Sequence, residues 1–170
     1  WSAAIDALAF GRAIDSTDTR MMRLDREETP KPRLFTIAAG NIRDLRATDD
    51  HLAINDLRPV EDPGQAWNAV TVGAYAAKDD MSGAAPLFHG YTPIAARGEL
   101  SPVSRTSVTF DAKNWPFKPE VVADGGNWAS SPDRTSVDTP GNLGLLTTRL
   151  QTLGQGFFTV TRDTSAAAAQ

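Results

Sequence analysis

Residues Arg33-Leu-Phe-Thr-Ile-Ala-Ala-Gly-Asn41 form a nearly continuous apolar run that ends in Gly-Asn. Short apolar runs of this kind are typical of parallel strands buried on both faces, and a Gly-Asn pair is typical of the turn that ends such a strand. Ala69-Val-Thr-Val-Gly-Ala-Tyr75 has the same character. We therefore expect Leu34–Ala39 and Val70–Tyr75 to be neighbouring parallel strands.

Two shorter runs and one amphipathic segment complete the predicted layout. Pro119–Ala123 and Phe157–Thr161 have the pattern of a third and a fourth buried strand, and Ser2 is placed to cap a helix that runs to about Ile14. Residues from about 76 to 118 are rich in glycine and proline, which predicts a long, loop-rich insertion. Together these segments predict an α/β fold with a mostly parallel sheet.

Composition excludes several classes of protein. The 170 residues carry a net charge of −4 with acids and bases intermixed, so we expect no nucleic-acid partner. No apolar run reaches the roughly 20 residues that a membrane-spanning helix needs, so we expect no membrane partner. The absence of cysteine excludes disulfides, thiolate metal sites and cysteine nucleophiles, but it leaves the cellular compartment open.

Asn41 and Ser165 are the two candidate functional residues. Ser165 follows a predicted strand and is succeeded by four alanines, so its hydroxyl is expected in the first turn of a helix, where free backbone N–H groups favour negative charge. An asparagine at a neighbouring strand end is placed to donate a second hydrogen bond to an oxyanion. Taken singly, each motif is more commonly a helix cap or a strand-ending turn. Their value lies in occurring together on a parallel-sheet pattern.

Six segments, in chain order and across nearly the whole chain, resemble motifs of the subtilase family of serine proteases. The last of them is similar to the G-T-S-x-(A/S)-A motif that carries the family's nucleophile, here Ser165. The segments are Ser2–Leu8 (the helix before the oxyanion strand), Thr36–Asn41 (the strand ending in the oxyanion asparagine), Trp67–Ala74 (N-A-(I/V)-T-V-G-A), Leu100–Ser107 (F-S-S-x-G), Lys118–Gly126 (K-P-D-(V/I)-x-A-P-G) and Thr164–Ala169.

The resemblance implies a serine endopeptidase that hydrolyses protein or peptide substrates through an acyl-enzyme and needs no cofactor. Ser165 would be the nucleophile, and the Asn41 side chain and the Ser165 backbone N–H would bind the oxyanion. Ala38, Ala39 and Gly40 would form one wall of the pocket for the residue that precedes the scissile bond. The resemblance also implies a three-layer, mostly parallel sheet of the subtilisin type, of which this chain would be only a part.

Two residues depart from the family pattern. Asp163 stands where the family usually has glycine before the Thr-Ser pair, and Asp124 stands where proline is usual. Aspartate tolerates unusual backbone dihedral angles better than most residues, which fits a divergent active subgroup. The alternative is a catalytically dead, subtilase-like interaction or regulatory module. An esterase is a third reading, and the lack of a G-x-S-x-G motif counts against it.

The aspartate and histidine of a catalytic triad are not apparent in this sequence. A subtilase carries both ahead of its asparagine and serine, so we expect them upstream of Trp1. His51 lies in a charged segment and His89 in the glycine- and proline-rich insertion, and we interpret both as surface residues. Asp15-Ser-Thr17 resembles the family's aspartate motif only weakly, because it follows a predicted helix rather than a strand.

We therefore interpret residues 1–170 as a partial catalytic domain that lacks its upstream half and a downstream helix. Such a piece is expected to be inactive alone, and its open sheet edges favour self-association. Asp49-Asp-His51 and Asp79-Asp80 fit solvated loop charge better than metal ligands, so we predict no metal site.

Overall fold

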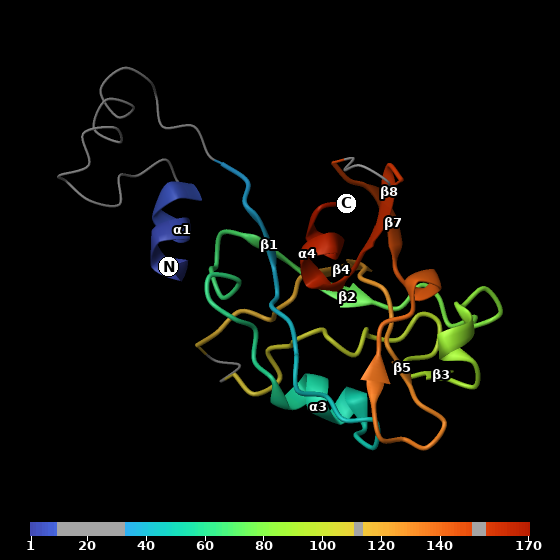
Figure 1. The fold of residues 1–170 in the computed structure, drawn as a ribbon. Helices are drawn as coiled ribbons and strands as arrows, with labels where there is room; N and C mark the ends of the chain where they lie inside the picture. Colours follow the sequence, from blue (N-terminus) through green and yellow to red (C-terminus); the bar gives the residue numbers. More distant parts are fainter. Residues whose placement is uncertain (10–32, 111–113, 151–155) are drawn as a thin grey trace.

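The computed structural model describes residues 1–9, 33–110, 114–150 and 156–170 (Figure 1). Its centre is a three-stranded sheet in the order β1-β2-β4, formed by β1 (Thr36–Ala38), β2 (Val70–Tyr75) and β4 (Val121–Asp124). Both pairings are parallel, and Thr36 lies opposite Val70 in the first of them. The structure therefore confirms the predicted parallel neighbours and shows a mixed α/β fold.

Burial within this sheet is less uniform than the sequence predicts. The inner residues of β2 are buried, whereas Val121 and Val122 of β4 are each 48% exposed. Both β1 and β4 are edge strands of the described sheet, so each has a neighbour on one side only. The prediction of full burial is right for β2 and wrong for the two edge strands.

The last helix packs directly on this sheet. α4 (Asp163–Ala168) contacts β1, β2 and β4, and Figure 1 shows it lying beside them. Ala167 joins Val72, Ala74 and Val103 in the buried core cluster. Small side chains on both surfaces let the helix approach the strands closely, and this brings the start of α4 to the carboxyl ends of β1 and β4.

The first helix, α1 (Ser2–Ala9), confirms part of the predicted helix, since the rest of that prediction lies outside the described residues. Ser2 does not cap it: the first backbone N–H groups, of Ala4 and Ile5, donate to the carbonyl oxygen of Trp1. The Ser2 hydroxyl instead donates to the Asp62 carboxylate of a distant loop. The capping prediction is therefore wrong, because a tertiary contact competes for the hydroxyl.

A further correction concerns Phe157–Thr161. β8 (Phe158–Thr161) is a strand, but it pairs antiparallel with β7 (Leu145–Thr148) in a separate two-stranded sheet. The exposed and half-buried residues of β7 alternate, as expected for a hairpin with one solvated face. The sequence reasoning missed β7 because Leu-Leu-Thr-Thr is too short and too polar to be distinguished from a loop.

The remaining elements are short and connect these sheets. They are α3 (His51–Leu57), the 3-10 turns η1 (Pro86–Phe88) and η2 (Gly141–Leu143), and β3 (Thr92–Pro93), β5 (Ala129–Ser130) and β6 (Val137–Asp138), which form a third sheet in the order β3-β5-β6. The described part of residues 76–118 holds η1 and β3. Its status as an insertion stays a prediction.

Within the described residues, no helix is long and apolar enough to cross a membrane.

Candidate active site

Asn41 lies just beyond β1, after a turn that requires glycine. Ala39 extends the pairing with β2 through its N–H, which donates to the carbonyl oxygen of Val72 over 2.9 Å. Gly40 then adopts φ +95°, which side-chain-bearing residues rarely adopt, and a Cβ there would lie 2.7 Å from the Glu61 carboxylate. The turn directs Asn41 away from the strand and toward α4.

The Asn41 side chain binds the residue that precedes Ser165. The backbone N–H of Thr164 donates to Asn41 Oδ1 over 2.9 Å, and the Thr164 hydroxyl lies 2.8 Å from the same oxygen. Because an amide oxygen only accepts hydrogen bonds, these contacts fix which end of the side chain is Oδ1. The NH₂ group of Asn41 therefore points away from Thr164 and keeps its donors for another partner.

Ser165 lies in the first turn of α4 with its side chain open to solvent. It faces a shallow hollow lined by residues of β7, β8 and α4 and by the two residues that follow α4, among them Leu146, Thr161 and Ala169. Thr164, its neighbour, is fully buried. The site thus combines an anchored backbone with an accessible hydroxyl, and Asn41 is bonded to the residue that precedes Ser165.

The three residues of the predicted pocket wall differ in exposure. Ala39 is 0% exposed, whereas Ala38 and Gly40 are half-buried. Surface at this place therefore comes from Ala38 and Gly40, and the wall's role in binding substrate stays a prediction.

Two further residues, not foreseen from the sequence, support this wall. The Arg105 guanidinium donates to the carbonyl oxygen of Asn41 over 3.1 Å and forms an ion pair of 2.8 Å with Glu61. The backbone N–H of Glu61 in turn donates to the carbonyl oxygen of Ala39 over 3.1 Å. Their partners are distant in sequence, so no local pattern indicates these contacts.

Asp163 has a structural partner. Its backbone lies in the left-handed region, at φ 75°, which explains why glycine suits this position. Its N–H donates to the carbonyl oxygen of Gly125 over 2.8 Å. Its buried carboxylate accepts a hydrogen bond of 2.9 Å from Arg43, two residues after Asn41.

Asp124 has a local role. Its Oδ1 accepts from the N–H of Gly126 over 2.9 Å, which forms a side-chain turn at the end of β4. The carboxylate thus stabilises, by this hydrogen bond, the turn in which the family usually has a proline. Gly125, inside this turn, lies against β2: a Cβ on it would be 2.4 Å from the Ala74 Cβ.

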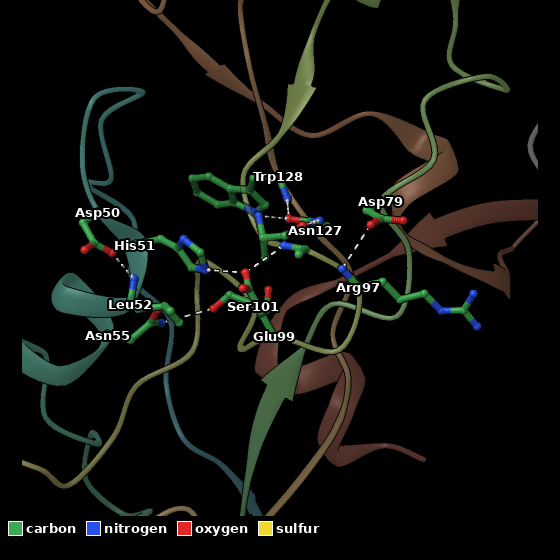
Figure 2. Close-up of polar contacts among 12 residues, drawn as sticks. Asp50, His51, Leu52, Asn55, Asp79, Arg97, Glu99, Ser101, Asn127 and Trp128 are labelled. Atoms are coloured by element: carbon green, nitrogen blue, oxygen red, sulfur yellow. Dashed lines mark hydrogen bonds and ion pairs between the residues drawn. The ribbon is translucent and has the colours of Figure 1, made fainter.

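The two histidines differ from each other. His89 is exposed, as expected, but His51 is buried at the start of α3, so the surface prediction for His51 is wrong. Figure 2 shows its ring pointing toward Glu99, and His51 Nε2 lies 3.7 Å from the Glu99 carboxylate. Figure 1 shows α3 well apart from α4, and no histidine among the described residues lines the hollow at Ser165.

The acidic loop residues have structural partners in the described part of the chain. Asp50 caps α3 by accepting from the N–H of Leu52 over 3.1 Å, and Asp79 accepts from the N–H of Arg97 over 3.1 Å (Figure 2). No group of three or more acidic, histidine or cysteine side chains suited to a metal ion occurs among the described residues. Asp15-Ser-Thr17, the weak match to the family's aspartate motif, lies outside the described residues.

Comparison with known proteins identifies a family for the chain. The sequence model of the subtilase family matches residues 1–170, which is the whole chain. No curated protein and no solved structure matches.

The contact between Gly125 and β2 yields a stability prediction. Gly125→Ala should lower the free energy of unfolding of the full-length protein by about 1–3 kcal/mol, because the added methyl group overpacks a buried contact. Gly83→Ala is the matched control, since a Cβ there meets only Asn142, at 4.0 Å. Thermal or denaturant unfolding measures both, and equal stability of the two variants would contradict the close packing of Gly125 on β2.

Proposed function

The chain belongs to the subtilase family of serine proteases, and on that premise we propose that it hydrolyses peptide bonds through an acyl-enzyme on Ser165. In this proposal β1, β2 and β4 are part of the larger, three-layer sheet of the subtilisin type. Asn41 donates to the oxyanion, and protein or peptide is the substrate. The observation that carries the proposal is the anchoring of Asn41 Oδ1 by the N–H of Thr164.

This anchoring favours an oxyanion role for chemical reasons. Asn41 cannot turn its oxygen toward a developing negative charge without losing the Thr164 contacts. Its NH₂ group and the Ser165 N–H therefore remain the donors at this end of the sheet. Donors fixed in place before the reaction stabilise a transition state best, because they need no reorganisation when charge develops.

The proposed reaction follows from these positions. Ser165 Oγ attacks the scissile carbonyl carbon while a histidine, expected upstream of Trp1, takes the hydroxyl proton. The carbonyl oxygen becomes an oxyanion held by Asn41 Nδ2 and the Ser165 N–H. Collapse breaks the C–N bond, and the histidine returns the proton to the leaving amine. Water then attacks the acyl-enzyme by the same route and releases the acid product.

The alternative is a catalytically dead module of the same fold. It rests on Asp163, an acid two residues from the nucleophile, at the place of the usual glycine. The structure provides that side chain with Arg43 as a partner and leaves Thr164 and Asn41 bonded. The substitution is therefore accommodated locally, which favours the active protease.

Substitutions in the full-length protein test the roles of Ser165 and Asn41. Ser165→Ala should abolish hydrolysis with little change in stability, because an exposed hydroxyl contributes little to folding. Asn41→Ala should lower kcat by about 10²–10³ with KM nearly unchanged, the magnitude known for loss of one oxyanion donor in a subtilisin. Steady-state kinetics on a peptide substrate measures both parameters. A rise in KM alone for Asn41→Ala would place Asn41 in substrate binding and contradict the oxyanion role.

The isolated chain of 170 residues should hydrolyse no peptide at a measurable rate. Without a histidine beside it, Ser165 stays a neutral alcohol, and subtilisins lacking triad members retain only about 10³–10⁴-fold acceleration over water. The purified chain is treated with a fluorophosphonate probe, and the label is mapped by mass spectrometry. Rapid, stoichiometric labelling of Ser165 would show that a base within the chain activates it and would contradict the proposed upstream histidine.

A further inference from the structure

We infer that Arg43 and Asp163 are a pair of positioning residues that holds Asn41 and Ser165 in register. The inference rests on the function proposed above and adds two residues to it. Arg43 follows Asn41 by two positions, and Asp163 precedes Ser165 by two. Their ion pair, with Arg43 Nη1 2.9 Å from Asp163 Oδ2, therefore bridges the same two segments that carry the oxyanion donor and the nucleophile.

The backbone of Asp163 shows that its side chain has a role of its own. A residue with φ 75° is strained unless it is glycine, and this one is also buried. Burying a carboxylate is unfavourable unless a charge or hydrogen bonds compensate it, and Asp163 Oδ1 has no hydrogen-bond partner among the described residues. Arg43 supplies the compensating charge at Oδ2. Backbone strain and carboxylate burial both disfavour aspartate at this position, and we explain its presence by the bond from its carboxylate to Arg43.

The pair acts through Asn41 and Thr164 rather than on substrate. The Asp163 side chain is 12% exposed: its Oδ1 is buried and its Oδ2 bonds Arg43. The Arg43 side chain is 66% exposed. Thr164 already contacts this turn through its N–H and its hydroxyl, which both lie near Asn41 Oδ1, and its hydroxyl is also 3.2 Å from the carbonyl oxygen of Gly40. The ion pair adds a tie one residue before Thr164 and two residues after Asn41, and this further tie limits how far the angle between the Asn41 donor and Ser165 can change.

Exposed ion pairs contribute little to stability in general, because solvent screens them. Here one partner is buried, and a charge-assisted hydrogen bond to a desolvated carboxylate is stronger and more directional. We therefore expect its loss to affect turnover more than folding, since reacting groups displaced by about 1 Å lose rate by about 10²-fold.

The test compares four variants of the full-length protein: Asp163→Gly, Arg43→Ala, the double variant and Arg43→Lys. Asp163→Gly introduces the residue that the family usually has here, which relieves the backbone strain and removes the ion pair with Arg43. We expect Asp163→Gly and Arg43→Ala each to lower kcat by at least about 10-fold with KM within about twofold, by the loss of positioning. The double variant should be no worse than either single variant, and Arg43→Lys should recover part of kcat because it keeps the charge.

Active-site titration with a fluorophosphonate accompanies the kinetics, so that kcat is expressed per reactive Ser165. Arg46→Ala is the matched control, an exposed arginine of the same loop, and it should behave as the wild type. If a variant loses total activity only because fewer of its molecules have a Ser165 that reacts with the fluorophosphonate, the pair has a purely structural role and the inference is overturned. Wild-type kcat in Asp163→Gly, additive losses in the double variant, or a change in KM alone would also overturn it.

The Ser165→Ala variant separates this inference from the proposed function. Wild-type hydrolysis that persists in Ser165→Ala would overturn the proposed function, and the positioning role with it. Hydrolysis that is lost in Ser165→Ala but complete in Asp163→Gly would overturn the positioning role alone.

Discussion

The hydrogen bond from the backbone N–H of Thr164 to the side-chain oxygen of Asn41 joins two segments 123 residues apart in the chain. It sets the direction of the Asn41 side chain and places the first turn of α4 against the end of β1. The proposed chemistry depends on this bond, because an oxyanion donor must stand beside the nucleophile before the substrate arrives. The Arg43–Asp163 pair spans the same gap.

Close packing of small residues makes that bond possible. α4 reaches the sheet through Ala166 and Ala167, which are buried against strands whose inner residues are small. A Cβ on Gly73 would lie 2.7 Å from Pro119, as one on Gly125 would meet Ala74. A larger side chain at Gly125 would press on Ala74 and on the start of α4, and one at Gly73 would press on Pro119 and Val122 at the other face of the sheet. The spacing of the site is therefore a property of the core beneath it.

Sequence reasoning predicted the features that local pattern determines. Apolar runs identified β1, β2 and β4, and the alanines after Ser165 identified α4. It failed where contacts between distant residues determine the structure. β8 pairs with β7 rather than with the central sheet, and His51 is buried near Glu99 although the sequence around it is charged. Residues such as Arg43 and Arg105 were missed for the same reason, since their partners lie 120 and 44 residues away. The roles of Asn41 and Ser165 came from their joint resemblance to family motifs.

A crystal structure of the full-length protein with a phosphonate bound covalently to Ser165 tests the central claim most directly. The phosphonyl oxygen should lie about 2.7–3.1 Å from both Asn41 Nδ2 and the Ser165 nitrogen, with Asn41 Oδ1 still bonded to the Thr164 N–H. An adduct whose phosphonyl oxygen faces solvent, with the Asn41 side chain turned away from it, would contradict the oxyanion role of Asn41.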